Sequence, residues 1–279
     1  MSAAPADRTL RRVMNARMYA VTPQVEAAWR ELLDHVTGEA DVSFEYLPYP
    51  APQPLEKLWA RADLGAVFMC GFPIALQLAP VVPIAAPIPR VDWAGGRAVY
   101  RTDLIVRADS PYGRLEDTFG GRAGWTVEHS HSGFNALRHH LLAYRTRERP
   151  ALYAQMTANL LTARNVLDSV REGRIDIGPL DAYWHMLIAR HAPALCAGVR
   201  VLTSTALEPM PAFVAAAGTP TDTLARLRAA FLAASTRAWF PALAERLQLE
   251  GFAAAEAESY ASLMQQDREA RAAGYEQPR

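Results

Sequence analysis

Apolar residues change their spacing along the chain, and this change predicts alternating strands and helices. Short apolar runs at 13–20, 42–47 and 64–69 predict buried strands. After the first run, Thr22 and Pro23 predict the start of a helix, because Thr is a favoured cap and Pro is favoured at the first helical position. Strands that alternate with helices predict an α/β protein. The apolar face of this first helix consists of Val25, Ala28, Trp29, Leu32 and Leu33.

Prolines interrupt the longest apolar stretch, residues 79–89. Because Pro lacks an N–H and clashes inside a helix, this stretch is predicted to be an extended segment or an edge strand. It is too short to cross a bilayer as a helix, and no apolar run in the sequence is longer. Residues 97–106 predict a long strand, and residues 221–273 predict mostly helix, interrupted near 249–253.

A strand pattern at 122–127 leads into a turn that holds Ser130, Ser132 and Gly133, and a helix pattern follows. The start of a helix presents unpaired N–H groups and partial positive charge. With hydroxyl groups beside it, such a turn suits an oxyanion, namely a phosphate, phosphonate, sulfonate or carboxylate. The competing interpretation is that a serine only caps the helix.

Charge and cysteine content narrow the classes of function. The chain has 29 Lys and Arg against 29 Asp and Glu, so its net charge is zero and it does not have the basic footprint of a nucleic-acid binder. The two cysteines, Cys70 and Cys196, do not form a metal-binding pattern. Residues 1–8 have no apolar core, which predicts a cytoplasmic chain or one from which a leader is absent.

Four stretches carry a family resemblance that spans most of the chain from Met18 to about Val214. In this order they resemble the type II periplasmic binding protein fold, and most closely the phosphonate and phosphite substrate-binding proteins of ABC transporters. The stretches are Met18-Tyr19; Asp63-Leu64-Gly65-Ala66-Val67 with Cys70-Gly71-Phe72-Pro73; residues 100–110 with Leu115-Glu116-Asp117 and Gly121-Arg122; and Ser130-His131-Ser132-Gly133 with residues 170–178 and Asp181.

The resemblance implies an α/β fold of two lobes, with two mixed sheets flanked by helices and two crossover strands that act as hinges. Hinges near 100–102 and 203–205 would place residues 1–101 and 205–279 in lobe one and residues 102–204 in lobe two. The implied partners are a small-molecule anion and the permease of an ABC transporter. Binding of nucleic acid is not expected, and neither is a membrane-spanning segment. The family implies a periplasmic location, and neither a cofactor nor a metal is expected.

His131 is a departure from the family, whose phosphonate binders typically have Ser-Thr-Ser-Gly at this turn. A bound anion beside its imidazole would raise the pKa of His131 and favour the imidazolium. The alternative is an exposed turn histidine. The sequence around Tyr183 and Trp184 is more aromatic than a small hydrated anion requires, which predicts a ligand with a ring or alkyl part.

The candidate ligand-binding residues lie at strand ends and turns, and each has a purely structural alternative. The serines and Asp181 also suit helix capping, and the tyrosines also suit core packing. Cys70 is expected to be a small residue that lines the cleft, in preference to a nucleophile. Gly71 would permit either a tight turn or the close approach of a ligand to the backbone. The candidates are Tyr19, Cys70, Gly71, Tyr100, Ser130, His131, Ser132, Gly133, Asp181 and Tyr183.

Two classes of function compete. The favoured one is a solute-binding protein that captures a small oxyanion-bearing ligand, phosphonate-, phosphate- or sulfonate-like, with room for an organic part. The other is a biosynthetic enzyme on the same fold, similar to pyrimidine-forming thiamine-precursor synthases that use their own histidine, and His129 and His131 keep it open. A cytoplasmic sensor domain is a third possibility. No cluster of Asp, Glu or Cys accompanies the histidines, so no metal site is expected.

Overall fold

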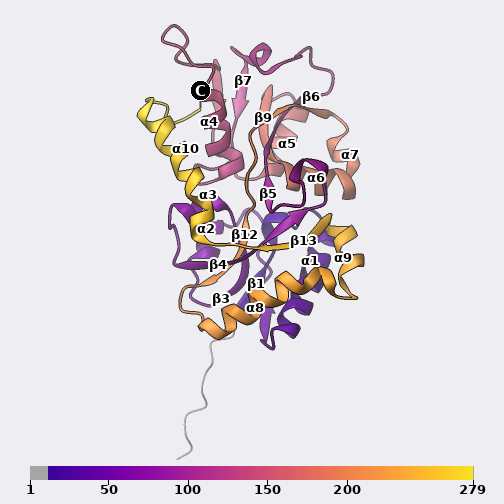
Figure 1. Ribbon diagram of the computed structural model, residues 1–279. Coiled ribbons are helices and arrows are strands. Elements are labelled where there is room, and N and C mark those ends of the chain that lie inside the picture. Colours follow the sequence, from indigo (N-terminus) through magenta and orange to yellow (C-terminus); the bar gives the residue numbers. More distant parts are fainter. Residues whose placement is uncertain (1–11, 279) are drawn as a thin grey trace, which may run out of the picture.

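The strands form two mixed sheets, one in each of two lobes (Figure 1). The computed structural model describes residues 12–278. Lobe one is built on a six-stranded sheet in the order β13-β4-β12-β3-β1-β2, in which β1 pairs in parallel with β2 and β3 while β4, β12 and β13 pair antiparallel. Its strands are β1 (Arg12–Asn15), β2 (Phe44–Tyr46), β3 (Leu64–Met69), β4 (Val81–Pro89), β12 (Ala212–Ala216) and β13 (Leu249–Ala254).

Lobe two is built on a five-stranded sheet in the order β10-β6-β9-β7-β8. Here β7 pairs in parallel with β8 and β9, and β6 pairs antiparallel with β9 and β10. The predicted architecture of two mixed sheets flanked by helices is confirmed. The strands are β6 (Thr102–Arg107), β7 (Arg122–Gly124), β8 (Gln155–Thr157), β9 (Ile177–Asp181) and β10 (Val199–Ser204).

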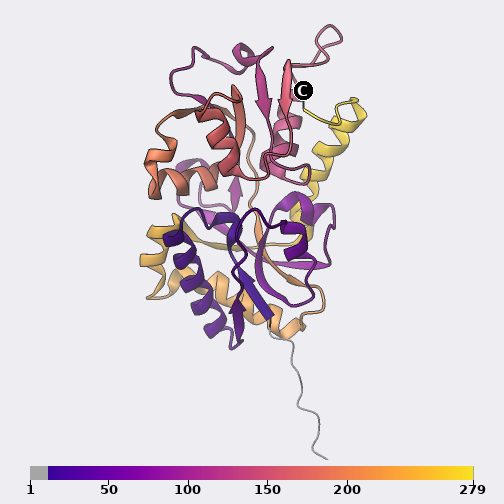
Figure 2. The ribbon, with the colours of Figure 1, turned by 180° about the vertical axis from the view of Figure 1, so that it is seen from behind.

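Two short strands connect the lobes. β5 (Val99–Tyr100) pairs antiparallel with β11 (Glu208–Pro209) as a separate two-stranded sheet between the larger sheets (Figure 2). Beside them, the Thr102 N–H donates to the Thr205 hydroxyl at 3.0 Å, and the Thr205 N–H donates to the Thr102 carbonyl at 2.9 Å. These crossings lie where the hinges are expected, and the division of the chain at 101/102 and 204/205 stays a prediction.

Local sequence signals account for several helices. In α1 (Pro23–Glu39) the Thr22 hydroxyl accepts the Val25 N–H at 3.3 Å, and Pro23 occupies the first helical position, as predicted. The buried residues of α1 include the five apolar residues of the predicted face. The other helices are α2 (Leu55–Trp59), α3 (Gly71–Ala75), α4 (Ala136–Leu142), α5 (Ala163–Arg171), α6 (Ala182–His191), α7 (Pro193–Cys196), α8 (Thr221–Ala233), α9 (Phe240–Leu247) and α10 (Ala261–Ala272).

Three segments differ from the sequence prediction. The proline-rich β4 is extended, but it lies between β13 and β12 instead of at an edge, and the ladder shifts register on both sides of it. Such shifts accommodate residues that cannot donate an N–H. The strand predicted at 13–20 ends at Asn15, and a 3₁₀ turn follows at Arg17–Tyr19. The long strand predicted at 97–106 is divided into β5 and β6 where the chain passes between lobes.

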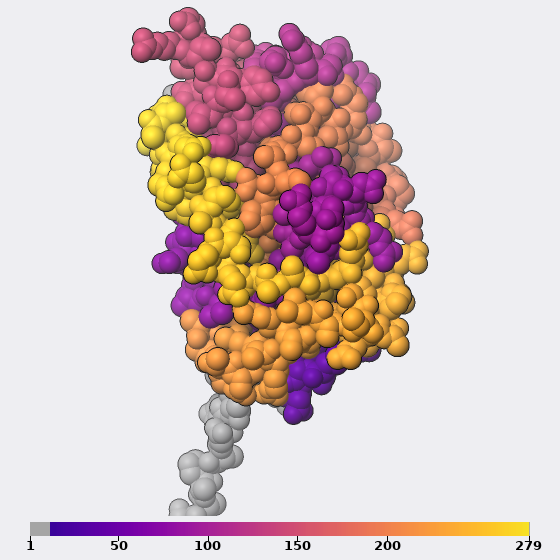
Figure 3. Space-filling view, viewed as in Figure 1, coloured from indigo at the N-terminus to yellow at the C-terminus, as the bar shows by residue number. Residues whose placement is uncertain are grey.

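The C-terminal helix α10 extends from lobe one onto lobe two (Figure 3), where it packs on α4. An ion pair between the fully buried Arg138 of α4 and the buried Asp267 of α10 joins the two helices. Arg138 also donates to the Glu276 carbonyl at 2.9 Å. α10 therefore contacts both lobes, and the assignment of residues 205–279 to lobe one stays a prediction.

Within residues 12–278, no helix has the length and apolar character needed to cross a membrane. Residues 1–8, on which the expectation about a leader rests, lie outside the described residues.

Candidate functional site

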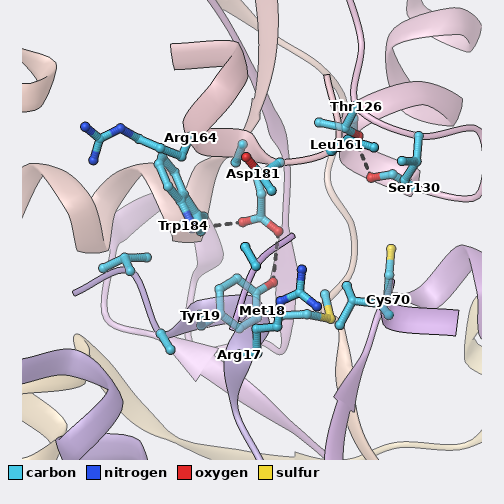
Figure 4. Close-up of a pocket in the computed structure, with 18 of the residues that line it drawn as sticks. Arg17, Met18, Tyr19, Cys70, Thr126, Ser130, Leu161, Arg164, Asp181 and Trp184 are labelled. Carbon is cyan, nitrogen blue, oxygen red and sulfur yellow. Dashed lines mark hydrogen bonds between the residues drawn. The ribbon is translucent and has the colours of Figure 1, made fainter. Parts of the chain in front are cut away.

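A cavity of about 470 Å³ lies between the lobes (Figure 4). Its walls combine aromatic and aliphatic side chains with a few polar groups, the usual composition of a small-molecule site. Lobe one contributes Arg17, Met18, Tyr19, Tyr49, Trp59 and Cys70, among others, and lobe two contributes Thr126, His129, Ser130, Ser132, Gly133, Leu161, Arg164, Asp181 and Trp184.

The serine turn lies on the cavity wall. The Ser130 hydroxyl accepts the Gly133 N–H at 3.0 Å, so this serine does cap the following helical segment. A hydroxyl that accepts one hydrogen bond retains its own proton for donation. Capping and anion binding are therefore compatible at Ser130. A π-helical turn, His131–Asn135, precedes α4, and such turns are frequent at functional sites.

Gly133 is required by the close packing of this turn. A β-carbon at position 133 would lie 1.9 Å from the Thr126 hydroxyl oxygen and 2.9 Å from the Ser130 hydroxyl oxygen. Thr126, which follows β7 and lines the cavity, was not predicted as a site residue. Its position near the end of the strand predicted at 122–127, four residues before Ser130, is the signal that the sequence offered.

Asp181 connects the two lobes inside the cavity. One carboxylate oxygen accepts the N–H groups of Tyr183 at 2.9 Å and Trp184 at 3.0 Å, and thereby caps α6. The other oxygen accepts the Tyr19 hydroxyl of lobe one at 2.9 Å. Burial raises the pKa of Asp181 to about 6, although these three hydrogen bonds act in the opposite direction. Burial and the neighbouring Asp181 also raise the pKa of Tyr19, so its hydroxyl stays a donor.

We expect Asp181 to make anion affinity depend on pH. A bound anion disfavours the ionised carboxylate, so it raises the pKa of Asp181 further above about 6. The affinity is then highest below that pKa and falls as the pH rises through the interval between the free and bound values. Titration calorimetry with methanesulfonate, whose charge is constant between about pH 5 and about pH 8, measures this dependence. Asp181→Asn should flatten it, and an unchanged slope in that variant would refute the assignment.

His131 does not line the cavity. Its side chain is buried, and the ring nitrogen Nδ1 lies 3.4 Å from the Asn135 amide. Burial lowers the pKa of His131 to about 3, with a smaller contribution from His139, so the imidazole is neutral at physiological pH. This corrects the expectation of a titrating imidazole: the ring is desolvated inside the protein, and it is not an exposed turn histidine either.

Other predicted residues are divided between the cavity and the core. Cys70 lines the cavity, where its sulfur accepts the His131 N–H at 3.4 Å, and burial raises the pKa of its thiol. Tyr100 and Tyr183 are buried outside the lining, and the Tyr183 hydroxyl donates to the Leu247 carbonyl of lobe one at 2.6 Å. Gly71 serves helix packing, because a β-carbon there would lie 2.4 Å from the Tyr260 ring.

Two arginines in the cavity wall were not predicted. Arg17 follows β1, lies with its guanidinium 5.5 Å from the centre of the Tyr49 ring, and donates to the Gln53 carbonyl. Arg164 belongs to the first turn of α5, and its Nε donates to Asp168 at 2.7 Å. Arg17 lies within the strand predicted at 13–20, and only the fold brings the two arginines to one cavity. Among the described residues, no group of three or more His, Cys, Asp or Glu side chains, including the histidines at 129, 131, 139 and 140, could hold a metal ion.

The sequence matches a family model described as "ABC transporter, phosphonate, periplasmic substrate-binding protein" over residues 20–260. No curated protein matches the chain.

Solved structures share the fold at low sequence identity. A binding protein component of an ABC phosphonate transporter from Pseudomonas aeruginosa is 14% identical, with a TM-score of 0.75 over 92% of this chain and 86% of that chain. PhnD1 from Prochlorococcus marinus, in complex with methylphosphonate, is 14% identical, with a TM-score of 0.75 over 93% of this chain and 98% of that chain. A Xanthomonas citri protein bound to a chloride ion is 21% identical, with a TM-score of 0.68 over 94% of this chain and 99% of that chain. At these identities the likeness establishes the two-lobed fold.

Proposed function

The chain belongs to the family of phosphonate ABC-transporter periplasmic substrate-binding proteins, and we propose that it captures a small oxyanion of phosphonate, phosphate or sulfonate type between its lobes. The observation that carries the proposal is the Ser130–Gly133 turn on the cavity wall, where a capping serine keeps its proton for an anion. The complex of PhnD1 with methylphosphonate, on the same fold, supports this class of ligand. The family consists of transport substrate-binding proteins, so the enzyme alternative is not carried further.

Membership of this family also implies a transporter as partner. We therefore propose that the protein acts in the periplasm and delivers its ligand to the permease of an ABC transporter. The crossover strands and the Tyr19–Asp181 hydrogen bond between the lobes support a cleft that closes around a ligand.

Removing the hydroxyls of both Ser130 and Ser132 is expected to weaken methylphosphonate binding at least tenfold. Each hydroxyl donates to a charged acceptor, and such hydrogen bonds contribute about 1.5–3 kcal/mol. Titration calorimetry of the Ser130→Ala/Ser132→Ala protein measures the loss. Thr22→Ala is the matched control, because it also removes a capping hydroxyl but lies outside the cavity lining. Equal affinities of the double variant and the control would overturn the proposal.

A further inference from the structure

The cavity is larger than an oxyanion head group requires. A water molecule takes about 30 Å³ of liquid volume, so one phosphonate or sulfonate group fills a small part of about 470 Å³. Pockets of about 300–1,000 Å³ accommodate drug-sized ligands. Room therefore remains beyond the Ser130–Gly133 turn for a larger body.

The far side of the cavity presents an aromatic ring and a guanidinium. Trp184 and Arg164 lie across the cavity from Ser130, with Asp181 between the two ends (Figure 4). Trp184 is held at the start of α6 by its N–H bond to Asp181. Among residues 12–278, no other aromatic side chain pairs with its indole. An indole in a cavity wall that has no aromatic partner in the protein is best suited to bind a planar ring of a ligand.

Arg164 reinforces this preference. Its hydrogen bond and ion pair with Asp168, one turn further along α5, orient the side chain, which is 44% exposed. A guanidinium plane stacks on aromatic rings and also binds acceptor groups at their edges. The far end of the cavity therefore suits a flat ring with polar edges.

Asp181 has acceptor capacity left for a ligand. A carboxylate has about four acceptor sites, and three hydrogen bonds from Tyr19, Tyr183 and Trp184 occupy three of them. Asp181 lines the cavity between the serine turn and Trp184. A hydroxyl or amino group in the middle of a ligand would satisfy the remaining acceptor site.

We propose, on the premise that the cavity captures an oxyanion, that its ligand joins this oxyanion through a donor-bearing linker to a planar aromatic ring. The head group binds Ser130 and Ser132, the donor binds Asp181, and the ring stacks on Trp184 beside Arg164. Aryl phosphonates contain the two ends of this arrangement, and nucleoside monophosphates contain all three parts.

Titration calorimetry with methylphosphonate, phenylphosphonate and adenosine 5′-monophosphate tests the proposal. We expect the ring to strengthen phenylphosphonate binding about tenfold over methylphosphonate, as stacking on an aromatic side chain commonly does. Trp184→Leu should remove this ratio, and Trp184→Phe should retain most of it. Trp239→Leu is the control, because Trp239 stacks on His35 in lobe one, outside the cavity lining. Asp181→Asn should lower the affinity of the nucleotide relative to that of phenylphosphonate, because only the nucleotide has a linker donor for Asp181.

The outcomes separate the two proposals. Equal binding of methylphosphonate and phenylphosphonate by the wild type, or an unchanged ratio in Trp184→Leu, overturns the aromatic subsite and leaves the oxyanion function in place. Failure of all three probes to bind overturns both. Thermal melting checks the fold of each variant. If Trp184→Leu does not fold, quenching of tryptophan fluorescence by phenylphosphonate decides. Because Trp59 also lines the cavity, the quenching must be weaker in Trp184→Phe than in the wild type, and undiminished quenching contradicts the subsite.

Discussion

Gly133→Ala is expected to lower methylphosphonate affinity at least tenfold and to destabilise the protein by about 1–3 kcal/mol. The new β-carbon would lie 1.9 Å from the Thr126 hydroxyl oxygen, a separation that real structures do not tolerate. The turn must therefore move, and its movement displaces Ser130 and Ser132 from the cavity wall. Titration calorimetry and thermal melting measure the two effects.

Two further variants test whether the loss of affinity comes from the clash at position 133. In Gly38→Ala the new β-carbon meets nothing within 4 Å, so affinity should not change. Adding Thr126→Ala to Gly133→Ala removes the closest clashing atom and should restore part of the affinity, because the Ser130 oxygen at 2.9 Å still restricts the site. Wild-type affinity in Gly133→Ala would show that the packing of this turn does not govern binding.

Asp267→Ala is expected to reduce the free energy of unfolding by about 3–5 kcal/mol. The substitution leaves Arg138, whose side chain is fully buried, without its carboxylate partner. The remaining acceptors of Arg138 are the Glu276 carbonyl and the Asn135 side chain, which carry no full charge. Urea-induced unfolding gives the measurement.

The exposed pair of Arg226 and Asp222 on α8 provides the control. Asp222→Ala should cost less than about 1 kcal/mol, because exposed ion pairs contribute little. Replacing both buried partners, as Arg138→Met with Asp267→Leu, should recover much of the loss, since no buried charge is then left unpaired. Similar losses in Asp267→Ala and Asp222→Ala would contradict the structural importance of the contact between α4 and α10.

Local patterns predicted individual strands and helices because they report on local physics, whereas the two-lobed architecture was implied by the family resemblance. Thr22 and Pro23 begin α1 where capping chemistry places them, and the apolar run at 64–69 is the buried strand β3. The turn with Ser130 and Ser132 was recognisable because a strand pattern meets a helix pattern there, and the structure places both serines at the cavity.

Features that depend on distant contacts could not be predicted. Whether the His131 ring faces the cavity depends on the π-helical turn and on the packing around it, which local sequence does not reveal. Arg17 and Arg164 lie far apart in sequence and meet one cavity only because the lobes face each other. The contact of Arg138 with Asp267 likewise joins segments 129 residues apart, so the position of α10 on lobe two had no local signal.

A crystal structure of the protein with methylphosphonate tests the central claim most directly. The account predicts the phosphonate between the lobes, with its oxygens about 2.5–3.0 Å from the hydroxyl oxygens of Ser130 and Ser132. A phosphonate bound elsewhere on the protein, or within the cavity but away from both serines, would contradict it.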